Sequence, residues 1–234
     1  MKNLSVFIVA VFIFCSCSKI TGEGPVVTET RNVANFTGID LRCSANVYYK
    51  QDAAYKVEVS AQKNILDVLI TEISNGKLVV RYKNGVSVKS NHKTTIVVSS
   101  PEANSFRISG SGDIKTTGPL TPSSLNLNIS GSGNILLTEL TTAFIDANIS
   151  GSGSIGASGG TVAEETLNIS GSGNIDLSNV AALKANTITS GSGETKVNVS
   201  ERLTVTISGS GSVYYKGNPV INVNISGSGK VLHL

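Results

Sequence analysis

Eight carboxylates between residues 113 and 201 are the first residues that could do chemistry. Cleavage of a polysaccharide needs two convergent carboxylates, or a base with a cationic partner. The eight residues are Asp113, Glu139, Asp146, Glu164, Glu165, Asp176, Glu194 and Glu201. This part of the chain consists of sequence repeats, and the eight carboxylates occupy unrelated positions within them. The repeat therefore places no two of them together. Aromatic side chains able to stack on sugars are few in the same region: Phe106, Phe144, Tyr214 and Tyr215.

Histidine and cysteine provide neither a metal site nor a nucleophile with partners. The histidines, His92 and His233, lie far apart in sequence, and we expect both at the surface. Cys15 belongs to a predicted N-terminal leader and Cys17 is the predicted lipidation site, so Cys43 has no partner for an intrachain disulfide. We expect Cys43 to be a buried, unreactive thiol. The sequence predicts no metal, no cofactor and no catalytic residue.

A basic segment lies between Glu72 and Glu102 and contains no acidic residue. Its cations are Lys77, Arg81, Lys83, Lys89 and Lys93. Solvated hairpin faces explain it most simply, and attraction to lipid phosphates or acidic polysaccharide is the alternative. Removal of the leader would leave a net charge of 18 − 16 = +2. This is too small to predict a nucleic acid partner.

The sequence Ser-Gly-Ser-Gly recurs regularly from residue 109 onward. It occurs seven times, starting at Ser109, Ser130, Ser150, Ser170, Ser190, Ser208 and Ser226. Alternating apolar and polar residues flank each copy, which is typical of half-buried strands. A near-constant spacing of 18 to 21 residues indicates a structural repeat.

The parity of the motif decides which residues face inward. Ile129 and Ile135 stand six residues apart, so both point to the same side of an extended backbone. The glycines between them share that side, where another stretch of backbone comes too close for a side chain. The structural glycines are Gly131, Gly133, Gly151, Gly153, Gly171, Gly173, Gly209 and Gly211. The outward serines form a candidate binding surface: Ser130, Ser132, Ser150, Ser152, Ser170, Ser172, Ser208 and Ser210.

One unit cannot bury its own apolar side, but stacked units bury continuous columns. The first column is Ile129, Ile149, Ile169, Ile207 and Ile225, and the second is Ile135, Ile155, Ile175 and Val213. This predicts an all-β fold, a β-solenoid or β-helix with about 18 to 21 residues per coil. A propeller blade needs about twice this period, and leucine-rich repeats need another consensus. In the fifth copy Ile188 comes one residue early, so either a bulge restores the register or Thr189 takes the inward place.

The N-terminus is typical of a lipoprotein signal peptide. Residues 1–16 combine one lysine with a short apolar run, and Ser16 precedes Cys17. Cys17 is therefore the predicted lipidation site, which would anchor the protein to a membrane. Ordinary secretion and a retained membrane anchor are the alternatives. Residues 17–32 lack periodicity and predict a tether.

Residues 33–105 predict an irregular N-terminal β region, and residues 106–234 the regular coils. The stretch around Cys43 can be laid on the stretch around Gly209, which makes it a degenerate copy of the same coil. The Asn-Gly pairs at 75–76 and 84–85 are typical of hairpin turns.

The Phe-x-Gly-Ile-x-Leu motif at Phe36 to Leu41 and the serial Ser-Gly-Ser-Gly units resemble one known family. It is the putative auto-transporter adhesin, head GIN domain family of bacterial cell-surface lipoproteins. The resemblance spans roughly residues 33 to 230. It implies a β-solenoid on a protein of the cell envelope.

Three functions remain open from the sequence. The leading hypothesis is a non-enzymatic lipoprotein of the cell envelope, at the outer membrane, whose rigid β surface adheres or binds protein or glycan partners. A polysaccharide-active β-helix enzyme is the second. The third is a flat array of hydroxyls that binds ice or a crystalline polymer, although serine lacks the methyl group that makes threonine rows rigid.

Overall fold

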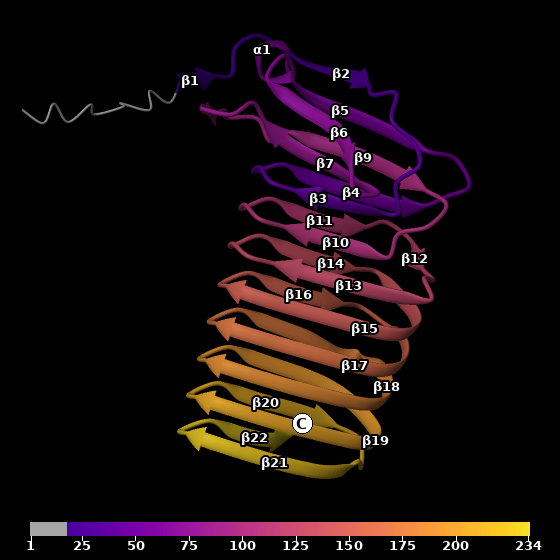
Figure 1. Cartoon of the computed structure of the whole chain (residues 1–234), viewed down its shortest axis with the longest axis vertical. Coiled ribbons are helices and arrows are strands. Elements are labelled where there is room, and N and C mark those ends of the chain that lie inside the picture. Colours follow the sequence, from indigo (N-terminus) through magenta and orange to yellow (C-terminus); the bar gives the residue numbers. More distant parts are fainter. Residues whose placement is uncertain (1–17) are drawn as a thin grey trace, which may run out of the picture.

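Parallel strands stack coil upon coil along one axis in the computed structural model, which describes residues 18–234 (Figure 1). Each coil has a front strand before the Ser-Gly-Ser-Gly motif and a back strand after it. Its chain returns to the front at the opposite corner. The predicted fold class, an all-β solenoid of about 20 residues per coil, is confirmed. The expected leader and Cys17 lie outside the described residues.

Front strands of the regular coils pair in parallel with their neighbours. They are β10 (Ser105–Ile108), β13 (Ser124–Ile129), β15 (Glu139–Gly151), β17 (Gly160–Gly171), the later parts of β18 (Asn174–Gly191) and β19 (Glu194–Gly209), and β21 (Val220–Gly227). The back strands are β11 (Asp113–Thr116), β14 (Asn134–Leu137), β16 (Ser154–Ala157), the early parts of β18 and β19, β20 (Ser212–Lys216) and β22 (Lys230–His233). The short β12 (Pro119–Leu120) pairs with the start of β15 at the return corner.

The core consists of columns of identical or similar side chains. Register places Ile129 on Ile149 and Ile149 on Ile169, and each is at most 2% exposed. On the back strands, Ile135 and Ile155 form an equally buried column. In the last coil the inward residues of β21 are more exposed, and Ile225 reaches 39%. Because apolar residues alternate with polar ones along each strand, every coil turns its apolar side chains inward, and the stacked coils share one continuous apolar core.

The glycines of the motif lie where neighbouring coils touch backbone to backbone. The Ser154 N–H donates to the Gly133 carbonyl across the coils, with 3.3 Å between nitrogen and oxygen. A Cβ on Gly153 would lie 2.3 Å from that same oxygen and 2.7 Å from Cγ2 of Ile129. Neither neighbour can move without disturbing the ladder. Glycine is therefore required by close approach at this corner.

Gly153→Ala should lower the free energy of unfolding by about 1 to 3 kcal/mol, because the added methyl overpacks a contact with backbone. Urea unfolding followed by circular dichroism measures the change. Ser152→Ala is the matched control, since Ser152 is exposed, and it should change stability by less than about 0.5 kcal/mol. Equal effects of the two variants would contradict the close contact.

The fifth copy of the motif keeps its register without a bulge. Ile169 pairs with Thr189 and Asn168 with Ile188. Thr189 thus takes the inward place and is fully buried, while Ile188 points outward and is 40% exposed. The hydroxyls of Thr187, Thr189 and Thr195 are buried without a hydrogen-bond partner among the described residues. This layer of the core is therefore less stable than its neighbours.

Thr189→Val should raise the free energy of unfolding by about 1 kcal/mol, because it replaces an unpaired buried hydroxyl with a methyl group. Thr206→Val is the control, since Thr206 lies half-buried on the outer side of the next coil. Thermal melting of both variants tests the prediction. A lower melting temperature for Thr189→Val would mean that the hydroxyl is satisfied.

An irregular β region covers the N-terminal end of the solenoid. Its elements are β3 (Gly38–Leu41), β4 (Asn46–Gln51), β5 (Lys56–Gln62), α1 (Lys63–Leu66), β6 (Leu69–Ser74), β7 (Lys77–Tyr82), β8 (Val86–Lys89) and β9 (Thr95–Ser100). Ile65 and Leu66 of α1 are buried against this end (Figure 1). The Asn75-Gly76 hairpin is confirmed, since both residues have positive φ (49° and 71°) and β6 runs antiparallel to β7. The second Asn-Gly pair also forms a turn, but β8 then pairs with β1 (Ser18–Thr21).

The first coil consists of β3 and β4, which pair in parallel with β10 and β11. Cys43 and Ala45 stand where later coils have glycine, and Cys43 is 6% exposed. A side chain fits here because the preceding strands, β7 and β9, are joined by the long segment 83–94 instead of a tight corner. Burial raises the pKa of the Cys43 thiol to about 12, so it is not a nucleophile at neutral pH.

The described part of the expected tether, residues 18–32, is not irregular. β1 pairs in parallel with β8, and β2 (Val26–Thr30) runs antiparallel to β5. The β-branched residues of β2 favour a strand. Gly24 (φ 76°) lies in the short bend between β1 and β2, so it does not prevent either strand. The first described residue, Ser18, therefore already belongs to a strand.

Candidate functional site

The outer side of the front strands presents a grid of polar residues in register. Asn128 pairs with Asn148 and Asn148 with Asn168. The Asn168 amide donates to the side-chain oxygen of Asn148 at 2.9 Å, and the Asn148 amide donates to Asp146 at 2.7 Å. Ile188 interrupts this asparagine row in the next coil. The outward side chains of β10, β13, β15 and β17, which include the uninterrupted part of this row, are called the front face below.

The predicted serine surface borders the front face along the motif corner. The first serines of successive motifs pair across coils, as Ser150 does with Ser170. The eight serines named from the sequence are exposed, while the glycines between them are buried or half-buried. The structure therefore brings these serines together in two parallel rows on one edge.

A polar groove opens where the front face meets the N-terminal region. Its volume is about 360 Å³, and it is lined by Lys77, Arg107, Asn128, Ile129, Ser130, Asn148 and Ser150. Gly38 is in contact with Ser105 of the next coil and has no side chain, and the Lys77 side chain passes 3.4 Å from where its Cβ would be. Arg107 lies two residue pairs further along the same strands.

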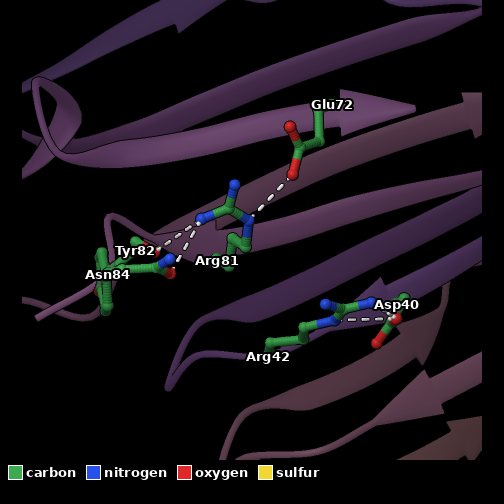
Figure 2. A network of polar contacts seen from close by, with 6 residues as sticks. All are labelled: Asp40, Arg42, Glu72, Arg81, Tyr82 and Asn84. Atoms are coloured by element: carbon green, nitrogen blue, oxygen red, sulfur yellow. Dashed lines mark hydrogen bonds and ion pairs between the residues drawn. The ribbon is translucent and has the colours of Figure 1, made fainter. Parts of the chain in front are cut away.

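Neighbouring arginines are already neutralised. Figure 2 shows Arg42 donating to Asp40 from Nε (2.9 Å) and Nη2 (2.6 Å), and Arg81 donating to Glu72 from Nε (2.9 Å). Lys77 and Arg107, in contrast, form no ion pair within residues 18–234. The groove therefore carries two cations available to a ligand.

A second hollow lies on the same face, toward the return corner. It measures about 340 Å³ and is lined by Ser124, Leu125, Asn126, Phe144, Ile145, Asp146, Glu164 and Thr166. Phe144 is 55% exposed, the most exposed of the aromatic residues named from the sequence. Phe106 by contrast is buried, with its ring centroid 5.2 Å from that of Tyr49. An exposed aromatic ring beside amide and carboxylate groups is a suitable platform for a sugar.

Most of the carboxylates named from the sequence are scattered over the front and back strands. Asp146 and Glu164 do line one hollow, but both are exposed. A glycosidase acid is normally shielded from water so that it keeps its proton. The arrangement favours hydrogen bonding to a ligand over bond cleavage.

Among the eight carboxylates named from the sequence, Glu165 is the one that is buried, and it faces the core. It stands between Ile145 and Ala185 in a buried column, and neither carboxylate oxygen has a partner among the described residues. Burial raises the pKa of Glu165 to about 8. Such a shift often marks a functional site, but no described cleft reaches this side chain, so its effect is on stability.

Glu165 should make the protein less stable as pH rises from about 4.5 to 8. In this window the folded state keeps the proton and the unfolded chain loses it, so each pH unit lowers the free energy of unfolding by up to about 1.4 kcal/mol. Denaturant unfolding at pH 5, 6, 7 and 8 measures this slope. Glu165→Gln should flatten it, and Glu164→Gln should not. An unchanged slope in Glu165→Gln would contradict the assignment.

Metal and membrane-spanning features are absent from the part of the chain that the structure describes. No group of histidine, cysteine and acidic residues there could hold a metal ion. His92 and His233 are both exposed, and the His233 ring contacts Tyr215 edge to face. No helix among residues 18–234 is long and apolar enough to cross a membrane.

The coil, its glycine corner and the N-terminal region together match a known family. Residues 35–219 match the family model described as "Putative auto-transporter adhesin, head GIN domain". The chain belongs to this family. The resemblance inferred from the motifs is thereby confirmed.

Solved structures agree with the head GIN domain assignment. A putative adhesin from Bacteroides fragilis NCTC 9343 has a TM-score of 0.87 at 25% identity, covering 92% of this chain and 100% of that one. A putative lipid binding protein from Parabacteroides distasonis ATCC 8503 has 0.80 at 28%, covering 93% and 100%. A putative adhesin from Parabacteroides merdae ATCC 43184 shares the fold, with 0.75 at 23%, covering 93% and 99%. No curated protein matches the sequence.

Two parts of the candidate site were not singled out as such from the sequence. Lys77 was named only within the basic segment, and Arg107 was not named at all. The two are 30 residues apart, and only the pairing of β7 with β3 and of β3 with β10 brings them together. Phe144 was identifiable as an aromatic residue, but its exposure depends on its place at the return corner.

Proposed function

We propose that this head GIN domain protein is a non-enzymatic adhesin of the cell envelope, lipidated at Cys17 and held at the outer membrane. Its front face and serine rows bind protein or glycan partners. The observation that carries the proposal is the front face itself, where hydrogen-bonding groups are fixed in register by the parallel ladders beneath them. A rigid surface loses little entropy on binding. Family membership supports the same function.

The position of Cys17 supports a lipid anchor at the covered end of the solenoid. Cys17 directly precedes Ser18, the first residue of β1. β1 and the segment around β8 carry Lys19, Lys83, Lys89 and Lys93, all exposed and without ion pairs in the described chain. Lysines beside a lipid anchor strengthen attachment to anionic membrane surfaces. The coils would then project away from the membrane.

The two alternative functions have less support. An enzyme would need a shielded acid beside a second carboxylate, and Asp146 and Glu164 are both exposed. An ice or polymer binder would need rows of rigidly held hydroxyls, whereas the serines of these rows lack the methyl group that makes threonine rows rigid. A ligand with a few specific contacts fits the surface better.

Cys17→Ala should release the protein from the membrane fraction into the soluble fraction, because it removes the acylated thiol. Immunoblotting of fractionated cells measures the distribution. Cys15→Ala is the matched control and should stay with the membranes. Membrane retention of Cys17→Ala with Cys15 intact would contradict the assignment.

Adhesion itself is tested with beads coated with residues 18–234. The beads should bind protein- or glycan-coated surfaces, and a protein with the front face altered by Asn148→Lys should bind less. Turnover of a polysaccharide by the purified protein, abolished by one Asp or Glu substitution, would overturn the non-enzymatic proposal.

A further inference from the structure

We propose that the front face between β10 and β17 binds an oligosaccharide that ends in one acidic sugar and continues in neutral sugars. The inference rests on the proposed adhesin function and names the ligand class of that surface. It follows from the two hollows of this face, which differ in charge.

The groove at the N-terminal end suits the acidic sugar. Lys77 and Arg107 line it together with the amides of Asn128 and Asn148, and no ion pair in the described chain occupies either cation. The nearest acid, Asp40, pairs with Arg107 across the ladder, but it is 5% exposed and already accepts two hydrogen bonds from Arg42. A guanidinium and an ammonium together recognise a carboxylate by charge-assisted hydrogen bonds.

The second hollow suits neutral sugars. The exposed Phe144 ring offers a surface for the apolar face of a sugar, and Asn126 and Thr166 offer hydrogen-bonding groups. Asp146 and Glu164 accept hydrogen bonds from sugar hydroxyls and repel a second negative charge. Glu164 pairs across the ladder with Lys184, which reduces this repulsion only partly because both are exposed.

The separation of the hollows sets the length of the ligand. Asn148 in the groove and Phe144 in the second hollow are four residues apart on β15. An extended strand spans about 13 Å over that distance, which a short oligosaccharide can bridge. Asp146 lies between them and accepts a hydrogen bond from the Asn148 amide, which holds both side chains in place.

A protein partner fits this surface less well. Protein interfaces depend on a desolvated core of aromatic and aliphatic side chains, whereas Phe144 is the one large apolar side chain on this face that is more than half exposed. A polyanion with a charge on every sugar fits less well too, because it would place carboxylates against Asp146 and Glu164.

The test compares 3′-sialyllactose with lactose, which differ by the one acidic sugar, and with oligogalacturonate, which is charged on every sugar. Isothermal titration calorimetry of residues 18–234 at low and high salt measures affinity. We expect 3′-sialyllactose to bind at least about tenfold more tightly than either other sugar, since its carboxylate accepts charge-assisted hydrogen bonds, which are stronger than neutral ones. High salt should reduce this difference.

Variants at each hollow separate the two contributions. Lys77→Gln with Arg107→Gln should remove the preference for 3′-sialyllactose over lactose. Phe144→Ala should weaken both sugars by about threefold to tenfold. Arg202→Gln and Leu183→Ala are the matched controls, being an exposed cation and an exposed apolar residue elsewhere on the solenoid. They should leave both affinities unchanged, and circular dichroism verifies that all variants fold.

Equal binding of 3′-sialyllactose and lactose, tighter binding of oligogalacturonate, or an unchanged preference in the Lys77/Arg107 variant would each overturn the inference. Binding to phosphate-bearing vesicles in place of sugars would overturn it as well. If none of the sugars binds but coated beads still adhere, the ligand class is wrong and the adhesin function stands. If the beads also fail to adhere, both proposals fall.

Discussion

A backbone hydrogen bond between coils at the motif corner constrains the whole solenoid. From the second motif on, the N–H of the second serine of each motif donates to the carbonyl of a glycine one coil back, as Ser172 donates to Gly151 at 3.0 Å. The chain turns sharply at that point, so the carbonyl lies where the next coil would place a Cβ. Only glycine satisfies both the turn and the hydrogen bond. The corner therefore fixes the register of the strands on either side of it.

Fixed register places equivalent residues in columns, and this has opposite effects inside and outside. Inside, a column of isoleucines packs well, but an intruder such as Glu165 or Thr189 is held in the core because its strand cannot slip. Slippage by one residue would turn every side chain to the other face. Outside, the same restriction aligns asparagines and serines without further support. Stability is thus lost at a few core positions while the outer surface stays ordered.

Much of this could be predicted from the sequence, because the corner repeats and a strand has a period of two. The coil length follows from the spacing between motifs, and the inward glycines and outward serines follow from counting between Ile129 and Ile135. Residues 18–32 could not be placed in the same way, because β1 and β2 depend on partners far along the chain. The groove could not be predicted for the same reason, since Lys77 and Arg107 come from strands that meet only through β3. Local patterns determine the coils, whereas the cap depends on pairings between distant segments.

The N-terminal region also explains where the ligand groups gather. Cys43 and Ala45 are tolerated in the first coil because the unit before it lacks the tight corner. Gly38 of β3 has no side chain, and the Lys77 side chain from β7 passes over it. Of the two cations of the groove, Lys77 therefore comes from the irregular region and Arg107 from the first regular front strand, whereas the aromatic and amide groups come from the regular coils.

The stacking of parallel strands also fixes distances along the axis of the solenoid. Each coil advances the structure by about 4.8 Å, the spacing between hydrogen-bonded strands, and the corner hydrogen bond permits growth only by whole coils. Insertion or loss of one coil would move everything beyond it by one such step without changing which residues face outward. The distance between the covered end and any surface group is therefore set in discrete increments by the number of Ser-Gly-Ser-Gly motifs between them.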